Sequence, residues 1–126
     1  MRSIGLALGL LAVVPAFAGT PNGILEGYRA AGAATVSAPR GEQLFTSRHG
    51  SDWSCSSCHT GNPLARGRHA TTGKDIAPLA PAANAERFTD PARVEKWFRR
   101  NCNDVLGRAC SVQEKADVLA YLMSLR

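Results

Sequence analysis

The pattern C-x-x-C-H, formed by Cys55, Cys58 and His59 in the segment WSCSSCHT, constrains this chain more than any other feature. On a single turn of helix the two thiols lie where they can join the two vinyl groups of one porphyrin. The imidazole that follows directly then lies under the iron, which a neutral ring nitrogen can bind. The motif therefore predicts one covalent haem c, attached at Cys55 and Cys58, with His59 as the proximal iron ligand.

Two other interpretations of the motif are a redox-active dithiol and half of a zinc site. A thioredoxin-like dithiol requires a βαβ context, which this sequence does not show. Zinc requires four ligands, and Cys102 and Cys110 are available to complete such a set. On that interpretation the position of His59 directly after Cys58 would be a coincidence, so haem attachment is favoured.

Residues 1–18 are predicted to be a secretory signal peptide. Arg2 precedes an apolar run at residues 4–14, and the small residues Ala16 and Ala18 define a cleavage site after Ala18. The run is shorter than the roughly 20 apolar residues that span a bilayer, and no second run of that length follows. We therefore expect an exported, periplasmic protein with no membrane span after cleavage, in a compartment that permits disulfides.

The length and charge of the chain limit what it can be. With 126 residues it is predicted to hold one small domain, which needs a cofactor or cross-link to complete its core. We expect an N-terminal extension at residues 19–37 and a haem domain at residues 38–126. The formal net charge of +5 suits an acidic partner. The basic residues are spread along the chain without a nucleic-acid-binding motif, so nucleic acid is not an expected partner.

The first half of the predicted mature chain shows two short helical patterns. Residues 24–31 are predicted to form one helix, and Ser37 is placed to cap another over residues 38–49. The segment 60–81 that follows the motif is rich in Gly, Pro and Thr. Because a structureless segment of this length is uncommon in a compact domain, we expect it to wrap the haem.

The second half shows two amphipathic helices. The first is capped by Asp90, begins at Pro91 and is predicted to end near Asn101. Ser111 and Glu114 form a capping box that opens the last helix. No segment alternates like a strand, so the predicted fold class is all-α.

Cys102 and Cys110 lack a following histidine and cannot form a second haem site. In an oxidising compartment we expect a disulfide between them, the alternative being two free thiols. Such a bond would tie the helix that is predicted to end near Asn101 to the last helix. In the chain-entropy account it contributes about 2–3 kcal/mol to stability.

The ligand on the opposite face of the iron is not evident from composition or spacing. Met123 is of the usual ligand type, but it lies in the final amphipathic helix, where methionine more often fills the core. His49 lies only six residues before Cys55, and His69 is expected to be exposed in the long loop. Asn101 suits a helix C-cap. The residues alone therefore leave the sixth position open or weakly held.

Two segments resemble the helices that cross in class I cytochromes c: GEQLF, with Gly41 and Phe45, and DVLAYLMSL, with Val118 and Tyr121. The longer segment RFTDPARVEKWFRRNCNDVLGRACSVQEKADVLAYL resembles the sphaeroides haem protein family. Members of that family are small high-spin c-type cytochromes with an asparagine as distal ligand. The resemblance covers residues 38–126 and implies a class I cytochrome c-like helical fold around one covalently bound haem.

The resemblance also assigns the distal side. In that family the residue just before the first disulfide cysteine binds the iron, and here this residue is Asn101; the related cytochrome c'' has histidine at this place. The resemblance thus implies that Asn101 binds ferric iron and leaves it on reduction, which opens a site for O₂ or NO. Trp97 and Phe98 are expected to line the distal side, and Arg87 is a candidate partner of the haem propionates.

The predicted c-type haem, the predicted export and the positive charge favour an electron carrier rather than an enzyme. The resemblance implies another c-type cytochrome, often dihaem, as redox partner. Two alternatives remain at this point. One is a gas-binding or gas-detoxifying haem protein, and the other is a peroxidase or a reductase of small molecules. For the last of these, His69 is the only candidate for acid–base chemistry.

Overall fold

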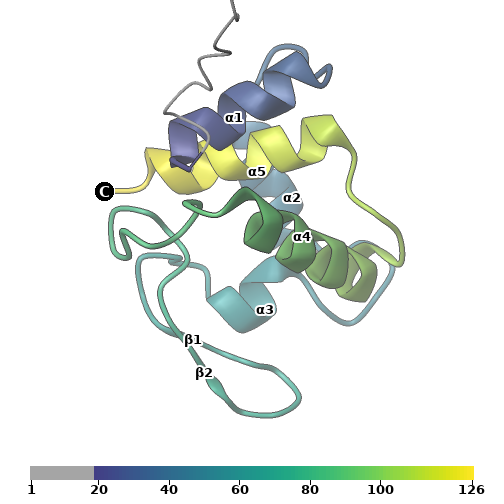
Figure 1. Cartoon of the computed structure of the whole chain (residues 1–126). Helices are drawn as coiled ribbons and strands as arrows, with labels where there is room; N and C mark the ends of the chain where they lie inside the picture. Colours follow the sequence, from purple (N-terminus) through teal and green to yellow (C-terminus); the bar gives the residue numbers. More distant parts are fainter. Residues whose placement is uncertain (1–18) are drawn as a thin grey trace, which may run out of the picture.

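Five α-helices and one two-stranded hairpin form residues 19–126, the part of the chain that this computed structural model describes. The predicted signal peptide at 1–18 lies outside the described residues. Within them, no helix is long and apolar enough to cross a membrane. The prediction of an all-α fold class is confirmed (Figure 1). In chain order the elements are α1 (Pro21–Ala30), α2 (Ala38–Thr46), α3 (Cys55–His59), β1 (Gly67–Arg68), β2 (Asp75–Ile76), α4 (Pro91–Leu106) and α5 (Val112–Ser124).

The antiparallel hairpin of β1 and β2 was not predicted from the sequence. Gly67 pairs with Ile76 and Arg68 with Asp75, so each strand is two residues long. Alternation between apolar and polar residues cannot be recognised in so short a strand. The hairpin lies within the segment that was expected to wrap the haem, and it gives that segment a structure of its own.

Capping residues set the helix boundaries more closely than the apolar pattern does. Thr20 accepts the N–H of Gly23 at 3.0 Å, so α1 begins three residues before Ile24, where the pattern had placed its start. Ser37 caps α2 as predicted, although this helix ends at Thr46 rather than at residue 49. The predicted capping box at the start of α5 is also present.

Helix α4 continues past Asn101, so its predicted end there and the interpretation of Asn101 as a C-cap are both wrong. The helix ends at Leu106 and is capped by Gly107, whose φ of 69° is a left-handed conformation that glycine adopts without strain. Val94, Cys102 and Val105 are buried along one side of α4. Because the buried side extends to Val105, packing favours helix through the turns that follow Asn101.

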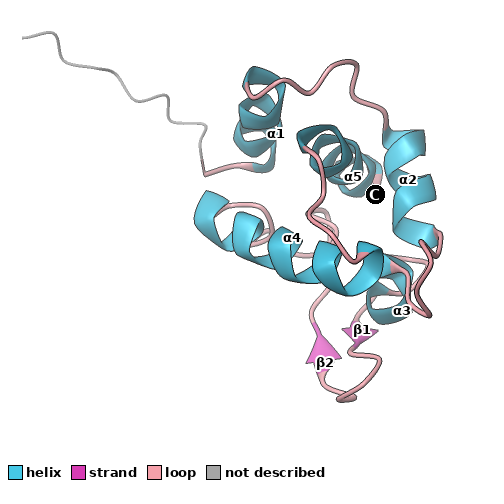
Figure 2. Cartoon of the chain, turned by 90° about the vertical axis from the view of Figure 1, so that its right-hand side faces the viewer, coloured by secondary structure: helices cyan, strands magenta, loops and turns pink. Residues whose placement is uncertain are grey.

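Helix α5 forms the centre of the fold, with α1 and α2 packed against it (Figure 2). Helix α2 crosses α5 at Gly41, where an added Cβ would overlap the backbone carbonyl of Asp117. Phe45 packs beside Tyr121 at the same crossing, with 5.6 Å between ring centroids. The predicted contact between these two helices is therefore confirmed, and it requires glycine at position 41.

Asp117 is a buried carboxylate at this crossing. Its oxygens accept hydrogen bonds from the Ser37 backbone at 2.7 Å, from Arg40 Nε at 2.9 Å and from Gln113 Nε2 at 3.0 Å. Burial raises the pKa of Asp117, but the hydrogen bond from Arg40, followed by those from Ser37 and Gln113, outweighs it and holds the pKa below its ordinary value. The cluster fixes the start of α2 on α5.

A second polar cluster joins α1, α4 and α5. Glu95 accepts one hydrogen bond from the Tyr28 hydroxyl and one from Lys115 Nζ, each at 2.7 Å. Ile24 and Leu25 of α1 are buried in the core. Residues 19–37, which were expected to be an extension, therefore contain a helix that packs against the rest of the fold.

Gly41→Ala is expected to lower the free energy of unfolding by about 1–3 kcal/mol, because the new methyl group must push the two helices apart. Gly27→Ala is the matched control: it lies in α1 with nothing within 4 Å of the added Cβ. That variant should be neutral or more stable by about 0.5–1 kcal/mol. Urea unfolding of the haem-loaded protein measures both. Equal stability of the two variants would contradict the close crossing.

Asp117→Asn is expected to cost about 1–3 kcal/mol at pH 7, because it removes a buried charge-assisted cluster. A carboxylate with a depressed folded-state pKa contributes stability above its unfolded pKa of about 3.9 and loses it as the pH falls through the folded value. The stability difference between wild type and variant should therefore shrink below about pH 4. Urea unfolding across this pH range, with the exposed Asp104→Asn as control, tests this. A stability difference between wild type and Asp117→Asn that did not change with pH would contradict the depressed pKa of Asp117.

Candidate haem site

Helix α3 holds the C-x-x-C-H motif on a single turn, as the motif predicts. Cys55 and Cys58 are free thiols, and both are half-buried. The backbone N–H of Ser54 donates to the Ser57 hydroxyl at 2.9 Å, which caps the start of the turn. Thr60 ends it with a left-handed φ of 65°. The two thiols are thus held at neighbouring positions of one short, capped helix.

The β-hairpin and α2 hold α3 from two sides. An added Cβ at Gly67 would overlap the carbonyl oxygen of Cys58, so β1 can pass this close only as glycine. The backbone N–H of Ala70 points to the Cys58 sulfur at 3.3 Å. On the other side, the Phe45 ring lies 6.1 Å from the His59 ring, measured between centroids. Sequence patterns did not indicate the role of Gly67, because a lone glycine in a loop has many explanations.

Electrostatics favour a neutral imidazole at His59. Burial, together with the smaller effect of the positive charge of Arg87, lowers the pKa of His59 to about 4. A neutral ring nitrogen is the form that binds iron. Burial raises the pKa of Cys55 to about 11, so this thiol does not resemble the activated thiolates of dithiol oxidoreductases.

The disulfide predicted between Cys102 and Cys110 is present, with 5.6 Å between the Cα atoms. It joins α4 to the residue before the cap of α5. Because these two sulfurs are bonded to each other, they are not available as zinc ligands. Among residues 19–126, no group of three or more His, Cys, Asp or Glu side chains is placed to hold a metal ion. The zinc interpretation is therefore not supported.

Three of the alternative distal ligands have other roles. His49 Nε2 is hydrogen-bonded to the Leu44 carbonyl at 2.8 Å. His69 is exposed in the hairpin, where its Nδ1 accepts the backbone N–H of Thr72 at 3.1 Å. Met123 packs against the hydrophobic core.

Asn101 lies inside α4 next to the disulfide, and its side chain is half-buried. Within the described residues its amide group forms no hydrogen bond. Trp97, one helical turn earlier and on the same side of α4, is 45% exposed, and Trp53, beside the motif, is 43% exposed. Phe98 instead packs edge-on against Tyr28, with centroids 6.3 Å apart. The distal candidates thus combine an unpaired amide with partly uncovered aromatic rings.

Arg87 holds the backbone of the long loop. Its guanidinium donates to the Pro78 carbonyl at 3.0 Å and to the Ala77 carbonyl at 2.9 Å. The Pro63 carbonyl in turn accepts the N–H groups of Leu79 and Ala80, each at 3.0 Å. These bonds brace the segment that follows the motif. A role of Arg87 toward the haem propionates stays a prediction.

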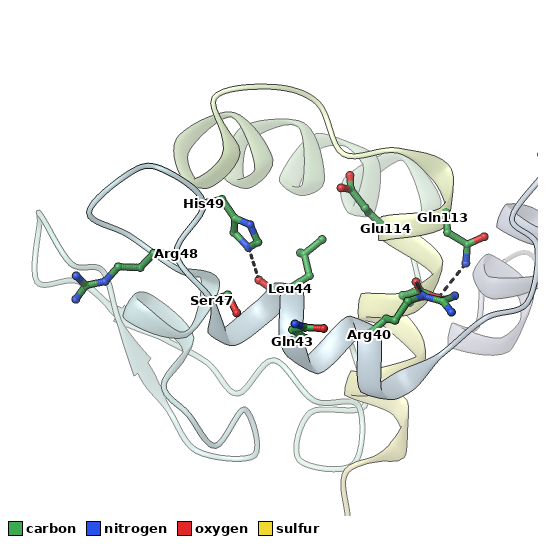
Figure 3. Close-up of a pocket in the computed structure, with 9 residues that line it drawn as sticks. Arg40, Gln43, Leu44, Ser47, Arg48, His49, Gln113 and Glu114 are labelled. Atoms are coloured by element: carbon green, nitrogen blue, oxygen red, sulfur yellow. Dashed lines mark hydrogen bonds and ion pairs between the residues drawn. The ribbon is translucent and has the colours of Figure 1, made fainter.

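Two surface hollows of the described residues contain none of the predicted haem-binding residues. Figure 3 shows one of about 460 Å³, lined by the end of α2 and the start of α5. At its edge the His49 ring is hydrogen-bonded to the Leu44 carbonyl at the end of α2. The hollow therefore lies apart from the motif chemistry.

The residues present fit a c-type haem. Two free thiols and a neutral imidazole share one turn, and the residues that α4 contributes include an amide without a protein partner and a half-exposed tryptophan. Apart from the Glu95 cluster, the disulfide and its buried side, α4 makes few close backbone contacts with other helices. A porphyrin attached to α3 would add apolar contacts to these partly covered aromatic rings.

Gly67→Ala is expected to displace β1 from α3 and to lower the thermal midpoint of the haem-loaded protein by about 5–10 °C, equivalent to about 1–2 kcal/mol. Gly61→Ala is the matched control, because nothing lies within 4 Å of its added Cβ. Thermal unfolding followed in the haem absorption band distinguishes them. Identical midpoints for the two variants would show that β1 does not support the motif.

Comparison with known proteins agrees with this site. A family described as a domain of unknown function (DUF1924) matches residues 31–122. The cytochrome c-type protein SHP of Cereibacter sphaeroides is 48% identical over 123 residues, which cover 93% of this chain and 95% of that protein.

Two solved structures are also similar. One is oxidised SHP, described as an oxygen-binding cytochrome c; it is 48% identical, with a TM-score of 0.76 over 82% of this chain and 95% of its own. The other is the solution structure of Methylophilus methylotrophus cytochrome c'', described in terms of haem-ligand detachment. It is 37% identical, with a TM-score of 0.69 over 82% of this chain and 92% of its own.

These comparisons confirm the cytochrome c-type helical fold and one covalent haem c as the cofactor, with which the Cys55–Cys58 motif is consistent. The match extends over almost the whole chain and over the family-model region that includes both cysteine pairs. The chain therefore belongs to the sphaeroides haem protein family of c-type cytochromes.

Proposed function

We propose that this chain is a periplasmic electron-carrying cytochrome with a distal ligand that depends on the oxidation state of the iron. Cys55 and Cys58 form the thioethers, His59 is the constant ligand and Asn101 binds only ferric iron. The observation that carries this proposal is the half-buried Asn101 amide, which has no hydrogen-bonding partner among the described residues.

Haem, when bound, supplies one-electron exchange and a coordination position for a diatomic gas. The residues around it differ in how firmly they are held. His59 is fixed by the short helix that also carries both thiols and by the Phe45 ring beside it. Its neutral imidazole is a good ligand in both oxidation states.

Asn101 offers a different kind of ligand. An amide oxygen is hard and weakly basic, so it suits ferric iron better than the softer ferrous iron. Helix α4 and the adjacent Cys102–Cys110 disulfide keep the amide near one position without a strong bond. Departure of Asn101 on reduction leaves the distal side to O₂ or NO. The description of a relative as an oxygen-binding cytochrome c supports this step.

Trp97 is the better candidate for covering this distal side. It shares a face of α4 with Asn101, and nearly half of its surface is uncovered by protein. Phe98 packs against Tyr28 of α1 and therefore supports the side of α4 that contacts α1. We retain both as haem-binding residues, with Trp97 nearer the exchangeable position.

A second function, gas binding as the main task, is favoured by the same labile ligand. Fast reversible reduction by another cytochrome supports the carrier, whereas tight O₂ or NO binding at physiological gas levels supports a gas-binding or detoxifying protein. An enzyme, either a peroxidase or a small-molecule reductase, requires acid–base groups near the iron. The acid–base candidate His69 is engaged in its own turn.

Absorption spectra of ferric and ferrous protein, with and without CO, test the proposed ligand. Wild type should be six-coordinate when ferric, high-spin and five-coordinate when ferrous, and should bind CO. Asn101→Ala should become five-coordinate or water-bound when ferric, whereas Asn103→Ala, an exposed asparagine of the same helix, should match wild type. A low-spin six-coordinate ferrous spectrum without added ligand contradicts the proposal.

A further inference from the structure

Three exposed cations form a stripe along α4. Arg93, Lys96 and Arg100 stand at positions i, i+3 and i+7 of the helix, so their side chains share one side. We call these three residues the α4 basic face. Helix α4 runs along one side of the molecule (Figure 2), and the side chains of all three residues are exposed. The stripe was not evident from the sequence, in which basic residues occur throughout.

The cations of the α4 basic face have no carboxylate partner among residues 19–126. Several cations elsewhere in the fold are paired, for example Arg40 with Asp117 and Arg108 with Glu114. Glu95, the acidic residue of the same helix segment, is turned to the opposite side and committed to Tyr28 and Lys115. The charge of this face is therefore not neutralised within the protein.

The position of these cations does not serve the helix itself. Lys96 and Arg100 are like charges at i and i+4, which repel each other. Arg93 lies in the first turn, where the helix dipole favours negative charge. An intramolecular stabilising role therefore does not account for the stripe, whereas an anionic surface outside the protein would complement it.

Trp97 connects this face to the proposed distal side. Its ring lies 5.9 Å from Lys96 Nζ and 5.6 Å from the Arg100 guanidinium carbon. It also stands one helical turn before Asn101. A protein docked on the cations would thus sit next to the residue that we place nearest the exchangeable position.

We propose that the α4 basic face is the docking surface for an acidic redox protein. The docked partner would donate one electron to the haem that Cys55, Cys58 and His59 would hold, and no covalent bond would form between the proteins. Complementary charge raises the rate at which the two proteins meet in a productive orientation. This inference rests on the proposed electron-carrying function and adds the surface and the charge of the partner.

A protein partner fits this face better than a nucleic acid or a membrane. The stripe holds three cations beside an aromatic ring on one helix, and cations with a neighbouring tryptophan are typical of the centre of protein interfaces. Asp104, further along the same helix, is exposed and limits this positive face to a short patch.

The test uses reduced flavodoxin, an acidic protein that donates one electron from its flavin hydroquinone, as the probe. The haem-loaded variant Arg93→Glu/Lys96→Glu/Arg100→Glu is compared with wild type in stopped-flow reduction across a range of ionic strength. At low salt the second-order rate should fall at least tenfold, and its decrease with added salt should disappear.

The matched control is Arg48→Glu/Arg66→Glu/Lys74→Glu, which changes the net charge equally at exposed cations without ion pairs outside α4. Its rate should stay within about threefold of wild type, since the steering field is local. If the reduction rate fell equally in the two triple variants, the effect would depend on net charge alone, and the assignment of the docking surface to α4 would be overturned. An unchanged rate in the α4 variant would overturn it as well.

Two further measurements distinguish the proposed docking surface from the electron-carrying function on which it rests. The midpoint potential and the ferric and ferrous spectra of the α4 variant should equal those of wild type; altered values would assign the cations to the haem instead of a partner. Binding to anionic phospholipid vesicles that depends on the three cations, with an unchanged flavodoxin rate, would assign the face to a membrane. Failure of the proposed ligand exchange itself would appear in the wild-type spectra and leave the docking rates unaffected.

Discussion

The close crossing of α2 and α5 at Gly41 is the constraint on which the rest of the structure depends. Helix α2 leads into the turn that carries both thiols and His59, so its position on α5 sets the proximal side. The start of α5 follows Cys110, whose disulfide to Cys102 holds the C-terminal part of α4 and thereby the proposed distal side. The position of α5 therefore determines where both sides of the proposed haem site lie.

The two sides differ in rigidity, and this difference is the basis of the proposed function. His59 lies within a capped turn supported by Phe45 and by the close approach of Gly67. Asn101 is positioned by α4 and the adjacent disulfide, and its amide has no protein partner among the described residues. A firm ligand opposite a weak one allows the oxidation state of the iron to decide whether the sixth position is filled.

Local signals predicted much of the fold, because caps and glycines act within a few residues. Ser37 and the Ser111–Glu114 box placed two helix starts correctly. The end of α4 was missed because Asn101 and Gly107 both suit a helix end, and only the buried contacts of Val105 decide between them. The C-x-x-C-H motif indicated the haem, whereas Asn101 as a ligand came from family resemblance, since asparagine has no distinctive pattern as an iron ligand. Long-range contacts such as Gly67 on Cys58 left no sequence pattern.

The midpoint potential of Asn101→Ala relative to wild type tests the central claim most directly. A ligand that prefers ferric iron stabilises that state and lowers the potential, by about 59 mV for each tenfold preference in affinity. Removing Asn101 should therefore raise the potential, whereas Asn103→Ala should leave it unchanged. An unchanged or lower potential in Asn101→Ala would show that Asn101 does not bind ferric iron preferentially, and the account of a redox-dependent ligand would be wrong.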